Sequence, residues 1–253
     1  FQDSGNVSIE KNSIYYSNDG IYFDGVNTET TTSITDNIIY NSLYNGYAIT
    51  IKDTLKPFIK NNEVRGYSNG IYCDNGNYTV YDGTINVSGN ILSVISDCNM
   101  DFVNVSFNST IISFSIGLTS FQNKYYLSTT INNQNNNPIP NAIVTVYDDN
   151  KSIEWNLTTD SNGQIINQPT IDYWRNSSTI YNHTNINITI SAGSNYNTTS
   201  GITKMDTNKE LTFILSETVP PPSITTTLSS SKSSKILINK NSVLTISKWK
   251  KWQ

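Results

Sequence analysis

The sequence of 253 residues predicts an all-β protein with three successive parts: a solenoid, a second strand-rich domain and an extended tail. Three observations support this prediction. Apolar residues alternate with polar ones at a period of two, and we find no sustained apolar period of 3.6 residues. Asn, Thr, Tyr and Ile are abundant, Asn alone occurring 37 times, and these residues favour strands and turns. A motif also recurs about every 25 residues near the N-terminus.

The repeat occupies three segments, IEKNSIYYSNDGIYFD at 9–24, ITDNIIYNSLYNGYAIT at 34–50 and IKNNEVRGYSNGIYCD at 59–74. Three columns keep one constant spacing along the chain: Ile9, Ile34 and Ile59; Asn12, Asn37 and Asn62; Ile14, Ile39 and Val64. The glycines Gly20, Gly46 and Gly70 align with a one-residue slip in the middle copy. Counting from these glycines aligns two further columns: Ile21, Tyr47 and Ile71; Phe23, Ile49 and Cys73.

A repeat of this length with strand periodicity indicates coils that bury their apolar faces by stacking on one another. Stacked coils place equivalent residues ~4.8 Å apart, so Ile lies on Ile and Asn on Asn. An Asn at a bend tolerates left-handed backbone angles and bonds to the Asn of the next coil, while Gly takes the tighter bend. Because parallel crossovers are overwhelmingly right-handed, the sequence predicts a right-handed parallel β-helix over residues 1–120.

These Ile-x-x-Asn-x-Ile…Gly-Ile repeats resemble those of pectate-lyase-like proteins, NosD-like periplasmic proteins and methanogen adhesin-like surface proteins, over roughly residues 5–120. The resemblance implies the β-helix fold and a secreted or surface setting. It implies no particular activity, because the motif encodes coil geometry rather than chemistry.

Cys73 and Cys98 are separated by the same interval as the members of each column, which predicts equivalent positions on adjacent coils. That placement would bring their Cα atoms within the ~4.4–6.8 Å that a disulfide requires. Two alternatives stay open: a disulfide that staples two coils in an oxidising compartment, and two buried free thiols.

Residues 121–217 predict a small β-sandwich, because short strands such as KYYLSTTI, AIVTVYD, NINITISAG and KELTFILSE alternate with turn signals. One run of residues carries a second resemblance: Pro138, Pro140, Asn141, Ala142, Val144, Val146, Thr159, Asp160, Asn162 and Gly163. This pattern resembles Ig-like carboxypeptidase-regulatory and Cna-B-like modules. The resemblance implies an Ig-like fold that serves as a spacer or stalk.

Residues 218–253 begin with a Pro/Ser/Thr-rich segment that has no means of packing a core. They carry six Lys and no acidic residue, whereas 1–217 carry ten basic and twenty acidic residues. One interpretation is a solvated tail, and another is a strand donated to a second copy. The residues predicted to meet an anionic glycan, a membrane surface or an acidic neighbouring subunit are Lys248, Trp249, Lys250, Lys251 and Trp252.

Catalytic and metal-binding signals are sparse. His183 is the only histidine and lies in the polar segment NHT, so we expect it on the surface; no zinc ligand set, other metal site or cofactor is predicted. No phosphate-binding loop or basic patch in the body indicates nucleic-acid binding. Hydrolysis would need two carboxyl groups about 5–9.5 Å apart. Asp24 and Asp74 share a column two coils apart, and the other candidates are Asp36, Asp53, Asp82, Asp97 and Asp101. Solubilising roles explain such residues equally well, so we predict no enzymatic activity.

Eleven Asn-x-Ser/Thr sequons predict a glycosylated, extracellular exterior: Asn6, Asn77, Asn86, Asn104, Asn108, Asn150, Asn156, Asn176, Asn182, Asn187 and Asn197. The chain starts at Phe1 rather than Met, which suggests a processed form. No apolar run approaches the ~20 residues of a membrane-spanning segment.

Tyr residues gather in the solenoid and suggest a surface on which sugars stack: Tyr15, Tyr16, Tyr22, Tyr40, Tyr44, Tyr67, Tyr72, Tyr78 and Tyr81. Partly exposed strands favour the same residue. We therefore predict an extracellular cell-surface structural or adhesin-like protein, in a surface layer, sheath or filament, and expect an archaeal setting. Its partners would be further copies, other surface proteins or glycans. The alternative is a carbohydrate-binding or polysaccharide-degrading β-helix protein.

Overall fold

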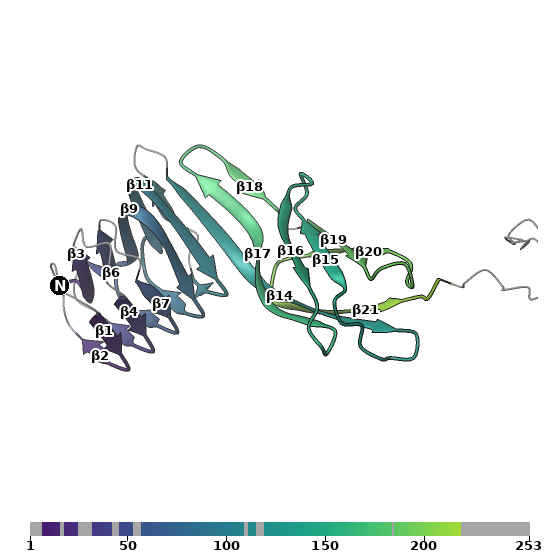
Figure 1. Cartoon of the computed structure of the whole chain (residues 1–253). Helices are drawn as coiled ribbons and strands as arrows, with labels where there is room; N and C mark the ends of the chain where they lie inside the picture. Colours follow the sequence, from purple (N-terminus) through teal and green to yellow (C-terminus); the bar gives the residue numbers. More distant parts are fainter. Residues whose placement is uncertain are drawn as a thin grey trace, which may run out of the picture.

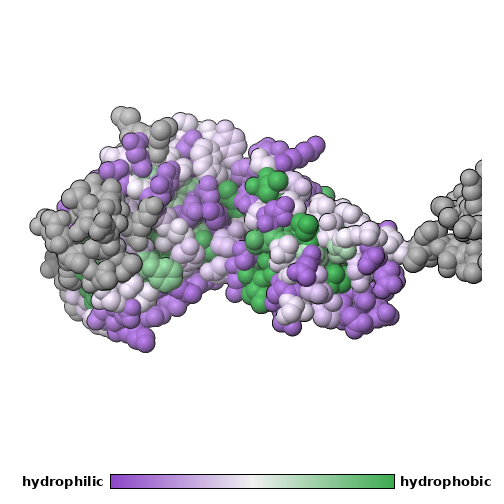
Figure 2. Space-filling model, in the orientation of Figure 1, coloured by the Kyte–Doolittle hydropathy of each residue, from purple (hydrophilic) through white to green (hydrophobic). Residues whose placement is uncertain are grey.

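The computed structural model describes residues 7–15, 18–24, 32–41, 46–52, 57–108, 111–114, 119–183 and 185–218. Strands account for most of these residues, and no helix occurs among them (Figure 1). The chain advances from stacked coils at the N-terminal end into a second group of strands. Figure 2 shows hydrophobic residues gathered on the visible face of this second group, with hydrophilic residues around them. The predicted tail beyond residue 218 and the sequon at Asn6 lie outside the described residues.

Each coil contributes strands to three parallel faces. The first face holds β1 (Val7–Glu10), β4 (Thr32–Thr35), β7 (Phe58–Lys60) and the C-terminal halves of β9 (Asn69–Tyr81) and β11 (Leu92–Val103). The second face holds β2 (Ser13–Tyr15), β5 (Ile38–Tyr40), β8 (Glu63–Arg65), β10 (Thr84–Asn86) and β12 (Ser106–Phe107). The third holds β3 (Ile21–Asp24), β6 (Tyr47–Lys52), the N-terminal halves of β9 and β11, and β13 (Ile112–Phe114). The prediction of a parallel β-helix is confirmed as a β-solenoid of about four turns.

The predicted columns of the first two faces are confirmed by the strand register. Ile34 pairs with Ile9 and Ile59, and Ile39 pairs with Ile14 and Val64. These side chains point inward, and Ile34, Ile39 and Ile59 are fully buried. Repetition of an apolar residue at one place in every coil thus builds a continuous core.

The predicted alignment of the third face is wrong by two residues in the middle coil. Phe23 pairs with Ile51, which pairs in turn with Cys73, whereas Ile49 pairs with Ile21 and Ile71. A slip of two residues leaves every side chain on the same side of the sheet, so the apolar pattern cannot reveal it. Gly46 therefore does not belong to the glycine column, since Ala48 is the residue that lies between Gly20 and Gly70 in the stack.

The asparagine ladder is confirmed, but its bend differs from the prediction. Asn12 Nδ2 donates to Asn37 Oδ1 at 3.2 Å, and Asn37 Nδ2 donates to Asn62 Oδ1 at 3.0 Å. The left-handed backbone belongs to the preceding residue of each coil, Lys11, Asp36, Asn61, Asp82 and Asn104, at φ 49–57°. In the first three coils one residue therefore turns the chain, and the Asn that follows it satisfies polar groups between coils. Asn37 and Asn62 are buried in this row, and Asn12 is exposed at its end.

The repeat shortens toward the C-terminal coils. Ile59 is the register partner of both Ile34 and Val80, and it lies closer along the chain to Val80 than to Ile34. The reason is that β9 and β11 run from the third face into the next first face as single strands. Within β9 the bend is made by Asn75 (φ 52°) and Gly76 (φ 154°). A constant repeat length therefore predicts the wrong register partners in these C-terminal coils.

Strand β14 (Ser120–Asn133) joins the solenoid to the second group of strands without a break. Its first residues pair in parallel with β11, and Leu127–Asn133 pair in parallel with β21 (Lys209–Leu215). Along nearly its whole length β14 also pairs antiparallel with β17 (Gln164–Asn176), which β18 (Ile180–Asn182) extends. The backbone thus forms one continuous sheet across the boundary predicted at residue 121.

A separate four-stranded antiparallel sheet completes the second unit, in the order β16 (Ile153–Thr158), β15 (Ile143–Tyr147), β19 (Asn185–Ser191) and β20 (Thr199–Lys204). Its inward residues pack against β14, β17 and β21 in a core that is distinct from the solenoid core. Val144, Val146 and Ile188 are fully buried there. The second unit is therefore two sheets that share one apolar core.

The run that starts at Pro138 and ends at Gly163 forms one connected structure. Thr159 Oγ1 accepts a hydrogen bond from the Ala142 N–H at 2.9 Å and donates to the Ile139 carbonyl at 2.8 Å. Asp160 Oδ1 accepts from the N–H of Gln164, and Gly163 turns the chain at φ 70°. The sequence motif thus reflects a buried hydroxyl that ties two turns together.

Candidate functional site: a polar groove on the solenoid

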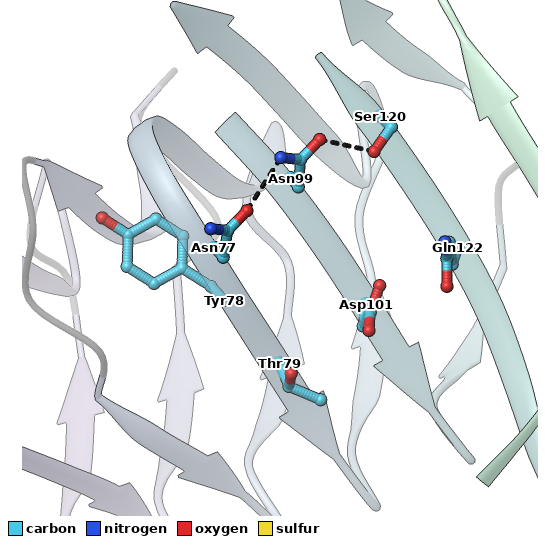
Figure 3. Close-up of a pocket in the computed structure, with 7 residues that line it drawn as sticks. All are labelled: Asn77, Tyr78, Thr79, Asn99, Asp101, Ser120 and Gln122. Carbon is cyan, nitrogen blue, oxygen red and sulfur yellow. Dashed lines mark hydrogen bonds between the residues drawn. The ribbon is translucent and has the colours of Figure 1, made fainter. Parts of the chain in front are cut away.

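A shallow pocket of about 400 Å³ lies on the first face of the solenoid, across β9, β11 and β14 (Figure 3). Its lining residues are Asn77, Tyr78, Thr79, Asn99, Asp101, Ser120 and Gln122. Two outward columns supply most of them, because the parallel register places Asn99 between Asn77 and Ser120, and Asp101 between Thr79 and Gln122. We call this pocket the polar groove.

Hydrogen bonds connect the first column across the three strands. Ser120 Oγ donates to Asn99 Oδ1 at 2.5 Å, and Asn99 Nδ2 donates to Asn77 Oδ1 at 2.8 Å. The bonds run in one direction, so the Asn77 amide nitrogen remains available as a donor at the end of the row. Figure 3 shows these side chains on the same side of the strands, while the Tyr78 ring points away from them.

The second column carries the charge of the groove. Asp101 Oδ2 lies 2.6 Å from Lys124 Nζ, and both side chains are largely shielded, with exposures of 30% and 19%. Asp101 is the single carboxylate among the lining residues. Acid–base hydrolysis requires two carboxyl groups on one face, so the lining residues of the groove do not supply that pair. They supply amide, hydroxyl and carboxylate groups, which can act as hydrogen-bond donors and acceptors.

Three residues beyond Thr79 in the chain, Asp82 connects the solenoid to the second unit. Its carboxylate accepts hydrogen bonds from Asn104 Nδ2 at 2.8 Å and from the Tyr126 hydroxyl at 3.2 Å. Burial, together with the negative charge of Asp82, raises the pKa of Tyr126 to about 12. Asn208, between β20 and β21, accepts from the Tyr126 N–H and donates to Asn104 Oδ1, both at 2.9 Å. These contacts hold the end of the solenoid against the β20–β21 turn.

The tyrosines do not form one flat sugar-stacking row. Tyr67 and Tyr78 are buried in the solenoid core at 0% and 3% exposure, contrary to the predicted surface role. Tyr22 and Tyr72 do lie outward on the third face, where Lys52 Nζ is 5.4 and 5.6 Å from their ring centroids. Tyr16 and Tyr44 lie outside the described residues.

The predicted carboxylate column is confirmed, but a lysine separates its members. Lys52 pairs in register with both Asp24 and Asp74, so it lies between them in the stack. Its ammonium group lies over the Tyr22 and Tyr72 rings, so a lysine residue occupies the row between the two aspartates, unlike in a catalytic pair that shares a substrate. Asp36 and Asp82 occupy coil bends, and Asp53 lies outside the described residues.

Cys73 and Cys98 meet in the core, with their Cα atoms 6.2 Å apart. The predicted common column is wrong, since Cys73 pairs with Val94 and Cys98 with Gly76. A register shift between Ile95 and Cys98 brings the second cysteine back toward the first. The Cα separation lies within the disulfide range, and the bond itself stays a prediction.

The described sequons fall into groups by exposure. Seven of the asparagines are exposed: Asn77, Asn86, Asn108, Asn150, Asn156, Asn182 and Asn197. Asn104, Asn176 and Asn187 are partly buried. A glycan is attached at Nδ2, and this atom donates to Asp82 in Asn104, to the Val87 carbonyl in Asn108 and to Ser216 Oγ in Asn197. Attachment at these three sites therefore requires a local rearrangement, whereas Asn150 and Asn156 are exposed.

His183 is placed differently from its prediction. Its side chain is only 12% exposed, and Nδ1 lies 2.9 Å from Asp149 Oδ1 and 3.5 Å from Asp148 Oδ2. The proximity of His183 to Asp148 and Asp149 was not predicted, because these residues meet only when β15 pairs with β19. The Asp-Asp pair directly after a predicted strand was the available signal.

No known protein-family model matches the chain, and no curated protein matches it. Among the described residues, no helix is long and apolar enough to cross a membrane.

Proposed function

We propose that this chain is an extracellular cell-surface protein with a structural or adhesin-like role, acting as a stiff rod within a surface layer, sheath or filament. In this proposal the solenoid is right-handed and the second unit is an Ig-like spacer. The protein works by holding surfaces or subunits at a set distance rather than by catalysis.

The observation that carries the proposal is the shared strand β14. Because β14 is hydrogen-bonded to β11, β17 and β21, the two units have no flexible linker between them. The contacts of Asp82, Tyr126 and Asn208 brace the same junction. Because the two cores share one strand, the two units should move together as one rigid rod.

The surface setting is supported by the exposed sequons and by two cysteines that meet with a disulfide-compatible Cα separation. Self-association through the basic segment 218–253 is supported by the charge contrast with the acidic body. That segment lies outside the described residues, so the contact it makes belongs to the proposal.

Negative-stain microscopy and light scattering on the chain with and without residues 218–253 test this assembly. Ordered filaments or sheets that vanish with the segment are the expected result. A monomer in both preparations at protein concentrations up to about 1 mM, where contacts with millimolar dissociation constants would already form, would contradict the structural role.

The second candidate is carbohydrate binding, which the polar groove favours. The row Ser120–Asn99–Asn77 offers directed hydrogen bonds to sugar hydroxyls, and Asp101 adds a charged acceptor. Saturable binding in a glycan array is expected to be lost in Asn99→Ala. The matched control is Asn156→Ala, an exposed asparagine on the second unit. Equal binding by both variants would remove the groove from consideration.

A further inference from the structure

Three segments that are distant in the sequence meet at one end of the second unit. Asp148 and Asp149 begin the turn between β15 and β16, and His183 follows β18. The His183 N–H donates to the Asp172 carbonyl at 2.7 Å, which fixes the histidine beside β17. The side chains of Asp148, Asp149 and His183 converge so that their potential ligand atoms all lie within 4.8 Å of one another.

The spacing of these atoms suits a metal ion. Metal–ligand bonds of about 2.0–2.2 Å with tetrahedral or octahedral angles place neighbouring ligand atoms roughly 3.0–3.5 Å apart. The distances from His183 Nδ1 to the two carboxylates are 2.9 and 3.5 Å. An imidazole nitrogen with carboxylate oxygens is a donor set that Zn²⁺ and related transition metals accept, whereas Ca²⁺ takes oxygen ligands.

A second observation concerns Asp148 itself. Its side chain is 8% exposed, so the carboxylate is more than nine-tenths buried. Oδ1 accepts a hydrogen bond from the Ser152 N–H at 2.7 Å, and Oδ2 lies 3.5 Å from His183 Nδ1, the same atom that Asp149 Oδ1 approaches to 2.9 Å. One imidazole nitrogen carries at most one hydrogen, so it cannot donate fully to both carboxylates, and a cation between them would stabilise the buried Asp148.

The surrounding charge points the same way. Glu154, on β16, has a pKa raised by burial and by the charge of Asp148, with Lys124 and His183 acting in the opposite direction. Lys124 is already bonded to Asp101 at 2.6 Å. Asp148, Asp149 and Glu154 therefore bring three carboxyl groups close to one imidazole, and a bound cation would offset their negative charge.

We propose that Asp148, Asp149 and His183 form a site for a divalent transition-metal ion, with Zn²⁺ as the best fit. The ion binds to His183 Nδ1 and to one oxygen of each aspartate, and solvent completes its coordination on the exposed Asp149 side. It would clamp the β15–β16 turn to the start of β19, beside the junction with the solenoid.

Isothermal titration of the untagged full-length chain with ZnCl₂ tests the site, with CaCl₂ as the comparison. We expect one saturable equivalent of Zn²⁺, a higher melting temperature with Zn²⁺ present, and little response to Ca²⁺. His183→Ala and Asp149→Ala should each weaken Zn²⁺ binding at least about tenfold, since each removes one ligand. Glu217→Gln, an exposed acid elsewhere on the second unit, should bind like the parent chain.

Circular dichroism confirms that each variant is folded, and Asp149 is exposed, so its replacement leaves the core intact. Absence of saturable Zn²⁺ binding by the folded parent chain up to about 1 mM would overturn the proposal. Binding that persists unchanged in both His183→Ala and Asp149→Ala would also overturn it, because the metal would then lie elsewhere. Neither outcome depends on whether the chain forms filaments.

Discussion

The two cores of this protein are stabilised in different ways. In the solenoid the same contact is made in successive coils, as in the ladder from Asn12 through Asn37 to Asn62. The second unit instead contains contacts that occur at a single place, such as the bridge that the Thr159 hydroxyl makes between Ala142 and Ile139. A repeated contact spreads its stabilisation over several residues, whereas a unique contact concentrates it in one. Substitutions should therefore reveal gradients along the solenoid and isolated sensitive positions in the second unit.

The largest expected effect tests whether the two cores unfold together. Phe102 is fully buried in the solenoid and packs against Phe121 with ring centroids 5.0 Å apart, and Ile188 is fully buried in the second unit. Phe102→Ala should cost about 3–5 kcal/mol of unfolding free energy and Ile188→Ala about 2–5 kcal/mol. Since β14 belongs to both cores, each variant should shift one common transition in differential scanning calorimetry. Two transitions that respond separately would mean that the shared strand does not couple the units.

A smaller effect is expected from the cysteines of the solenoid. If Cys73 and Cys98 are bonded, reduction should destabilise the chain by about 2–4 kcal/mol, because the crosslink restricts the unfolded chain. Mass spectrometry after alkylation without reductant measures the bond directly. The double variant Cys73→Ser/Cys98→Ser is the control and should not respond to reductant. Alkylation of both cysteines in the chain that was denatured without reductant would show that both are free thiols.

The gradient along the asparagine ladder gives the next effect. Asn37 is 1% exposed and bonds to Asn12, Asn62 and the Ile9 carbonyl, whereas Asn12 is exposed at the end of the row. Asn37→Ala should cost about 1–3 kcal/mol, because it leaves buried partners unsatisfied, and Asn12→Ala clearly less. Urea denaturation measures both. Equal costs would show that the ladder does not act as a repeated contact.

The smallest effect is a pH dependence in the second unit. Burial, with the charge of Asp148 adding to it, raises the pKa of Glu154 in the folded state. A carboxyl with a raised folded pKa favours folding below its unfolded pKa, and this contribution is lost as the pH rises through the folded pKa. In metal-free buffer, Glu154→Gln should therefore raise the melting temperature at pH 7, and the gain should shrink toward pH 4. The exposed Glu217→Gln should show no such trend.

Much of the solenoid was predictable because its pattern is local and repeated. The columns of Ile34 and Ile39 follow from spacing alone, and the register confirms them. The third face was not predictable in detail, because a two-residue slip moves Ile51 into the Phe23 column without changing which side is buried. The repeat also shortens after Ile59, whose next partner Val80 comes sooner along the chain than a constant period would place it.

The candidate sites were less predictable for the same reason. The polar groove takes residues from three coils whose register depends on the shortened repeat, so Asn77, Asn99 and Ser120 do not keep the spacing of the N-terminal columns. His183 reaches Asp148 only through the pairing of β15 with β19, which propensity does not encode. The sequence predicted Asp101 as a carboxylate of interest, but not its pairing with Lys124.

Strand β14 also has a mechanical consequence. The solenoid is attached to its N-terminal end, and the chain leaves the second unit from the C-terminal end of β21, which runs parallel to β14. A pull between solenoid and tail therefore draws the two strands in opposite directions along their common axis. The hydrogen bonds that join them lie across that axis, so they resist together rather than opening one after another. A protein anchored at one end and loaded at the other would keep its length under tension until the whole strand pair slides.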